Sequence, residues 1–95
     1  MKKFLFLAHG DVDRSPESQQ AHRRWWMSIQ DHVVDSGNPL FNGRNVTADG
    51  TVSEVSADMS PATGYSLIQA ESLDAAVALL RECPMDMWVY EAMPM

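Results

Sequence analysis

The chain opens with a short apolar run that predicts a buried strand. This run extends from Phe4 to Ala8, has polar residues on both sides and is closed by Gly10. Its length and lack of alternation are typical of a strand that is covered on both faces. A helix is predicted to begin at Ser15-Pro16-Glu17, because serine caps free amides, proline suits the first helical position and glutamate favours the positive end of the helix dipole.

The segment after this start carries apolar and aromatic residues at helical spacing. Positions 22, 25, 26, 29 and 33 fall on one face of a helix. Gly37 is a natural C-cap, and Asn38-Pro39 prevents the helix from continuing. We therefore predict one long helix that includes Val33 and Val34.

The second half of the chain predicts a hairpin, a central strand, a helix and a final strand. Residues 44–48 and 51–56 flank Asp49-Gly50, which is a strong signal for a two-residue hairpin turn. Residues 57–63 are small and polar and predict a loop, and residues 64–70 predict a strand. Ser72 caps a second helix that Cys83-Pro84 ends, and residues 87–93 alternate as a last strand.

This order of elements predicts the fold class and an assembly. The order β-α-β-β-β-α-β, with the hairpin as an elaboration, is a ferredoxin-like α+β pattern in which helices cover one face of an antiparallel sheet. Residues 4–7 are all apolar, so they cannot all point at two helices. A second copy of the chain would cover the other face in the simplest way. We therefore predict a homodimeric α/β barrel.

Composition limits the chain to a single domain and excludes several kinds of partner. The chain has 95 residues and a net charge of −6, so we expect one domain over 1–95. Residues 1–44 hold six basic and five acidic side chains, whereas residues 45–95 hold one basic and eight acidic ones. Because phosphate contacts dominate nucleic-acid affinity, neither nucleic acid nor an anionic membrane is expected as a partner. The single cysteine and the five-residue apolar run, too short for a signal peptide, predict a cytoplasmic protein.

The sharpest local candidate for chemistry follows the first strand. His9 could act as a general acid or base, because the unperturbed pKa of histidine lies near neutrality. Asp11 could orient His9, and Arg44 could bind a carboxylate in bidentate fashion. The alternative is structural: His9 would satisfy a backbone carbonyl, while Asp11 and Asp13 would cap the turn before Ser15.

Aromatic residues provide candidate walls for a binding site. Trp25 and Trp26 point about 100° apart on a helix, so one belongs in the core and Trp26 could line a pocket together with Tyr65. His22 and His32 are expected to be solvated or partly covered. No metal-ligand spacing is present, so no metal or other cofactor is predicted, and Cys83 is expected to be a packed, inert thiol.

The chain also resembles the YCII-related (DGPF-type) proteins over nearly its whole length. The resemblance is carried by Phe4-Leu5-Phe6-Leu7 with Gly10-Asp11, Ser15-Pro16-Glu17, Gly37-Asn38-Pro39-Leu40, Gly64-Tyr65 with Ile68, Ala70-Glu71-Ser72-Leu73-Asp74-Ala75-Ala76-Val77 and Cys83-Pro84. The Asp-Gly-Pro-Phe tetrapeptide itself is absent, since Asp49-Gly50 continues as Thr51-Val52.

This resemblance implies the dimeric α/β-barrel superfold, whose relatives include small oxygenases, isomerases and dehalogenating enzymes. It does not imply one activity, because the superfold hosts many. In members credited with catalysis a histidine and an aspartate pair in a cleft. The nearest equivalent of that histidine here is His22, and Cys83 or Asp86 occupies the place of the aspartate.

Three functions remain open at this point. The first is a cofactor-free acid–base enzyme, such as an isomerase, lyase or dehalogenase, that acts on a small organic molecule. The second is a non-catalytic ligand-binding or protein-interaction module. The third is a cofactor-free oxygenase, which only the aromatic wall supports.

Overall fold

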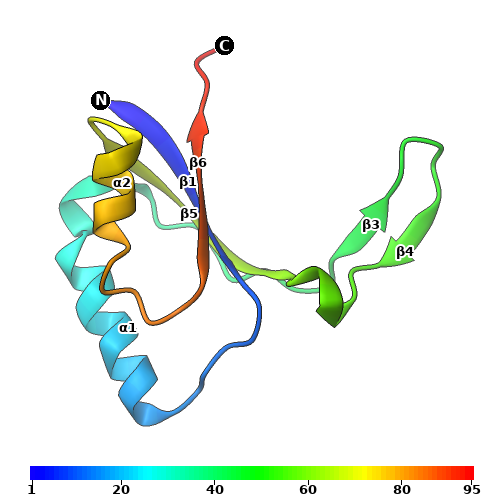
Figure 1. Ribbon diagram of the computed structural model, residues 1–95, viewed down its shortest axis with the longest axis horizontal. Helices are drawn as coiled ribbons and strands as arrows, with labels where there is room; N and C mark the ends of the chain where they lie inside the picture. The colour runs from blue at the N-terminus through cyan, green and yellow to red at the C-terminus, as the bar shows by residue number, and fades with distance from the viewer.

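A four-stranded antiparallel sheet forms the centre of the computed structural model, which describes residues 1–95 (Figure 1). The strands lie in the order β2-β5-β1-β6. Their bounds are β1 Lys2–His9, β2 Val33–Asp35, β5 Ala62–Ala70 and β6 Met87–Ala92. In chain order this is the arrangement of a ferredoxin-like fold, so the predicted α+β class with an antiparallel sheet is confirmed.

Two α-helices lie on the same side of this sheet (Figure 1). They are α1 (Pro16–Ser28) and α2 (Leu73–Leu79). Both caps form as predicted: the Ser15 side chain accepts a hydrogen bond from the Ser18 amide, and Ser72 accepts one from the Ala75 amide. Neither these helices nor any other in the structure has the length and apolar character needed to span a bilayer.

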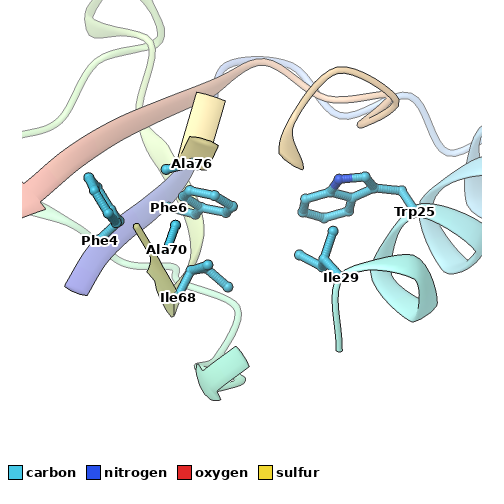
Figure 2. Packing of buried hydrophobic residues seen from close by; sticks show 7 residues of the cluster. All are labelled: Phe4, Phe6, Trp25, Ile29, Ile68, Ala70 and Ala76. Atoms are coloured by element: carbon cyan, nitrogen blue, oxygen red, sulfur yellow. The ribbon is translucent and has the colours of Figure 1, made fainter. Parts of the chain in front are cut away.

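The hydrophobic core lies between the helices and the sheet. Strand alternation turns Phe4, Phe6 and Ala8 of β1 toward the helices, and all three are buried. Phe6 and Ile68 of the sheet point toward α1 (Figure 2), where the buried side chains are Trp25 and Ile29. Seven of the buried residues pack together as one cluster: Phe4, Phe6, Trp25, Ile29, Ile68, Ala70 and Ala76.

The opposite face of the sheet has no covering layer. Leu5 and Leu7 alternate with the buried residues of β1 and are only half-buried. Across the ladders Leu5 pairs with Tyr90 and Leu7 pairs with Trp88. We call this side, formed by Leu5, Leu7, Leu67, Trp88 and Tyr90, the uncovered face.

The end of the first helix differs from the prediction. The helix stops at Ser28 and is followed by the 3₁₀ turn η1 (Gln30–His32). Val33 then pairs with Ile68 at the edge of the sheet. The residues of β2 were therefore predicted wrongly as helix, because Val33 also falls at helical spacing from Ile29. The β-branched side chains of Val33 and Val34 explain the outcome, because they favour a strand that can pair with a buried neighbour.

The predicted hairpin forms, but it stands apart from the main sheet. Strands β3 (Arg44–Val46) and β4 (Val52–Glu54) pair only with each other and project away from the body (Figure 1). The turn has three residues, 48–50, rather than two. The Thr47 amide donates to the Thr51 carbonyl, and the Gly50 amide donates to the Thr47 carbonyl. The radius of gyration is therefore 14.6 Å, against about 12.4 Å expected for a compact chain of this length.

A short 3₁₀ turn, η2 (Ala57–Met59), connects this hairpin to β5.

Candidate functional site

A pocket opens between α1 and the helix-facing side of the sheet. Its volume is about 590 Å³, which lies within the range of small-molecule sites. Phe6, Ala8 and Ser66 of the sheet contribute to it, and Trp25 and Trp26 of α1 lie opposite. The remaining lining residues are His22 of α1, Thr63, Gly64 and Tyr65 of β5, Met87 of β6, and Val12, Arg14, Ser36, Gly37, Asn38, Pro39, Leu40, Phe41 and Met85 of the segments between elements.

The segment after β2 forms one rim of the pocket because it follows β5 closely. Asn38 accepts a hydrogen bond from the Tyr65 amide through its backbone carbonyl, at 3.2 Å. Gly37 has φ +71, and a Cβ atom there would lie 1.8 Å from the Tyr65 carbonyl oxygen. Only glycine fits at this position, so Gly37 allows the rim to approach the strand.

Two indoles and one imidazole form the aromatic side of the pocket. The rings of Trp25 and Trp26 are 5.9 Å apart and inclined by 51°, and the ring of His22 lies 5.8 Å from that of Trp25. The Nε1 atom of Trp25 donates to the Leu79 carbonyl oxygen at 2.6 Å, which fixes its indole against α2. Trp26, which was predicted to line a pocket, is half-buried and does so.

The charged and titratable groups of the pocket are few. Arg14 is the only lining side chain that carries a full charge at neutral pH, and His22 is the only imidazole. No aspartate or glutamate lines the pocket, although the chain contains 13 of them. The lining therefore favours an apolar ligand and does not repel an anion.

His9 lies at the end of β1, where its ring is associated with the other side of the sheet. Its ring stacks on Trp88 of the uncovered face, with centroids 3.8 Å apart and planes inclined by 11°. Its Nδ1 atom lies 2.7 Å from the Ser60 hydroxyl, within hydrogen-bond distance. His9 does not line the pocket that holds Trp26.

The structure does not bring the predicted partners of His9 to it. Asp11 is exposed, and the position at His9 Nδ1 that it was expected to occupy is taken by Ser60. Arg44 begins β3 on the projecting hairpin, where its Nη1 atom donates to the Gly43 carbonyl at 2.8 Å. Within one chain, His9, Asp11 and Arg44 therefore share no hydrogen bond and none of them lines the pocket; their joint role in catalysis stays a prediction.

Tyr65 does take part in the pocket, at its rim. Its hydroxyl donates to Asn38 Oδ1 at 3.4 Å, and the residue lies opposite Leu7 in the β1–β5 ladder. This register places the Tyr65 side chain on the same side of the sheet as Leu7, so Tyr65 meets the pocket only at its rim, where it connects the rim segment to the strand.

Neither of the residues in the place of the family's aspartate lines the pocket. The carbonyl of Asp86 accepts a hydrogen bond from the His9 amide at 3.1 Å, and its side chain is exposed. Burial raises the pKa of the Cys83 thiol, with a smaller opposing effect from a backbone hydrogen bond at Met85. Nowhere do three histidine, cysteine or carboxylate side chains gather as a metal site would require.

Sequence reasoning did not single out Arg14 and Ser66. Arg14 stands between the first strand and the helix cap, a place where the chain passes the end of the sheet. Ser66 could have been found from strand alternation, because it shares the helix-facing side with Ile68. His22 was placed on the same helix face as Trp25 and Trp26 but was expected to be solvated or partly covered; in the structure it is half-buried, lies beside Trp25 and lines the pocket.

The fold and this pocket define a small α+β protein with a ligand-sized cavity between its helices and its sheet. No protein-family model and no curated protein sequence matches the chain. Among solved structures, the chain is similar to 5-chloro-2-hydroxyhydroquinone dehydrochlorinase (TftG) from Burkholderia phenoliruptrix AC1100 in complex with 2,5-dihydroxybenzoquinone. The TM-score is 0.54 at 16% identity, over 96% of this chain and 93% of that one. A likeness at this identity establishes a shared fold.

Proposed function

We propose that the chain binds a small organic molecule in the pocket between α1 and the sheet and performs acid–base chemistry on it without a cofactor. We further propose that it does so as one subunit of a homodimeric α/β barrel of the YCII-related type. The observation that carries the proposal is the lining of the pocket: aromatic and aliphatic walls, one imidazole and one guanidinium. A concave, mostly apolar cavity with a few polar groups is the usual form of a small-molecule site.

His22 is the proposed proton-transfer group. It is half-buried, lies beside Trp25 and lines the pocket. As a general base it would take a proton from a carbon or hydroxyl of the ligand, and the freed electron pair would form a new double bond. The proton then returns at another atom in an isomerisation. In the dehydrochlorination of a chloroquinol it returns at the carbon that bears chlorine, after which chloride departs with its bonding electrons and a second hydroxyl proton is lost, which leaves a quinone. The proton-transfer role of His9 stays a prediction, since that ring lies against Trp88.

The shape of the single chain supports the homodimer. Its accessible surface is 6980 Å², whereas a monomeric protein of this mass exposes about 5500 Å². The surplus of about 1500 Å² exceeds the roughly 800 Å² that each partner buries in a standard interface. Part of it comes from the hairpin of β3 and β4, and the uncovered face supplies apolar area that a second copy would bury.

A second candidate function is a ligand-binding module without catalysis. It is favoured by the absence of any carboxylate in the pocket, because a catalytic histidine is commonly oriented by a neighbouring acidic group. The two candidates share the pocket and differ only in what His22 does there.

Two measurements test the proposal in sequence. In the first, 2-naphthol is titrated into ¹⁵N-labelled protein, and the three indole N–H signals are assigned by single Trp→Phe variants. Binding in the pocket shifts the signals of Trp25 and Trp26 and leaves that of Trp88 in place. A titration that shifts no indole signal, or only that of Trp88, would refute the pocket as the binding site.

The second measurement separates the enzyme from the binding module. Chloride release from 5-chloro-2-hydroxyhydroquinone is followed for the unaltered protein, for H22Q and for the control H32Q. His32 lies outside the pocket, with its Nδ1 atom 3.2 Å from the Gln69 carbonyl. Release that is lost in H22Q and kept in H32Q supports the enzyme. The binding module is supported if the protein binds the ligand but converts neither 5-chloro-2-hydroxyhydroquinone nor an isomerisable quinol.

A further inference from the structure

The charge of the pocket lining has the opposite sign to the net charge of the chain. The chain has a net charge of −6, yet Arg14 supplies the only full charge among the 19 lining residues. The carboxylate nearest in sequence, Asp13, does not line the pocket, and its Oδ1 atom accepts a hydrogen bond from the Ser15 amide at 2.9 Å. The only full charge among the lining side chains is thus positive, in a protein that is negative as a whole.

The Arg14 guanidinium has no partner within the protein. The only ion pair of the structure joins Lys2 to Glu91. The backbone carbonyl of Arg14 accepts a hydrogen bond from the Gln19 side chain. The Arg14 side chain itself makes no hydrogen bond to the protein. An arginine offers five N–H donors in a planar fork that matches a carboxylate or a similar anion. At the edge of an apolar cavity, those donors are available to a ligand.

Ser66 provides an independent polar group inside the pocket. It is the only buried polar residue of the chain, with 5% of its surface exposed, and it lines the pocket. Its register partner in β1 is Phe6, so its side chain points to the helix side of the sheet. Its hydroxyl has no hydrogen bond to the protein, and no side-chain oxygen of the structure is both fully enclosed and unpaired. The Ser66 hydroxyl therefore opens into the pocket, where a ligand can satisfy it.

We infer that the ligand is a planar aromatic anion with a second polar substituent. Arg14 binds its negative charge, Ser66 hydrogen-bonds the second substituent, and the ring lies against Trp25 and Trp26. This inference rests on the proposed function, since it names the class of molecule that the same pocket takes. It also assigns Arg14 and Ser66 as the residues that determine specificity.

Three matched naphthalenes test this inference by fluorescence titration: 6-hydroxy-2-naphthoate, its uncharged amide 6-hydroxy-2-naphthamide, and 2-naphthoate, which lacks the hydroxyl. We expect R14Q to weaken binding of 6-hydroxy-2-naphthoate about tenfold, equivalent to about 1.4 kcal/mol, and to leave the amide within about twofold. S66A should weaken the binding of the two hydroxylated compounds by about threefold to fivefold, the size of one neutral hydrogen bond. It should leave the affinity for 2-naphthoate unchanged. R24Q makes the same change of charge at a residue outside the pocket and should leave all three affinities unchanged.

The outcomes separate this inference from the proposed function. If 2-naphthol shifts the signals of Trp25 and Trp26 but R14Q and R24Q bind 6-hydroxy-2-naphthoate equally well, the role of Arg14 is refuted and the pocket stands. If S66A does not distinguish the hydroxylated compounds from 2-naphthoate, the role of Ser66 is refuted. If neither 2-naphthol nor any of the three compounds shifts those indole signals, the proposed function itself fails.

Discussion

A lysine at the centre of the uncovered face should convert the proposed dimer into a monomer. Leu5 lies in the middle strand, β1, with Leu67 on one side and Tyr90 on the other. Its side chain is half-buried in the single chain and points away from the helices, so L5K leaves the core of the subunit intact. In a dimer that pairs the two uncovered faces, the same lysine would be buried without a partner.

The size of the effect follows from symmetry. Removing an unpaired charge from water costs several kcal/mol in real proteins, and relaxation at an interface reduces this to about 2 kcal/mol for each subunit. A twofold interface contains the substitution twice, so dimerisation loses about 4 kcal/mol. The dissociation constant then rises about a thousandfold. A dimer that is stable at nanomolar protein would fall apart at micromolar protein.

Light scattering after size exclusion measures this directly. At micromolar concentration we expect twice the chain mass of 10.6 kDa for the unaltered protein and a single chain mass for L5K. V77K serves as the control, because Val77 is 45% exposed on α2, on the helix side of the sheet. The reasoning is refuted if the unaltered protein has the mass of one chain, or if L5K and V77K remain equally dimeric.

Three further predictions concern the support of the fold. G37A should lower the free energy of unfolding by more than about 2 kcal/mol, since its Cβ would overlap the Tyr65 carbonyl. Denaturant unfolding measures this change. The control G50A should have a smaller effect, because a Cβ at Gly50 meets no atom within 4 Å. Hydrogen bonds, the largest from the Thr47 hydroxyl, lower the pKa of Asp49 from its ordinary 3.8 to about 2. Because this folded pKa lies below the unfolded one, the carboxylate stabilises the hairpin turn fully above about pH 4 and loses this effect as the pH falls through about 2; hairpin amide signals that are unchanged between pH 5 and pH 2 would contradict this. Cys83 should react with a thiol reagent many times more slowly in the native protein than after unfolding, because burial raises its pKa, and equal rates would refute that explanation.

The elements with local signals could be predicted from the sequence. Ser15 and Ser72 are caps whose chemistry depends on residues three positions away, and both form the expected hydrogen bonds. The strand β2 could not be found in this way, because Val33 suits a helical face as well as a strand. Only its pairing with Ile68, 35 positions further on, decides between the two.

The candidate site was harder to predict for a related reason. Counting alternate positions from Phe4 places His9 with Leu5 and Leu7, so its side of the sheet was already readable. Its contact with Ser60 was not, because the two residues are 51 positions apart and meet only through the folded chain. The pocket likewise joins Arg14, Trp26 and Ser66 from separate elements, and no local pattern brings these three together.

The most direct test of the binding site is a crystal structure of the protein with 6-hydroxy-2-naphthoate. We predict electron density for the ring between Trp26 and the sheet, with the carboxylate at Arg14 and the hydroxyl within hydrogen-bond distance of Ser66. Density for the compound against Trp88 on the uncovered face, with the pocket filled only by water, would contradict it.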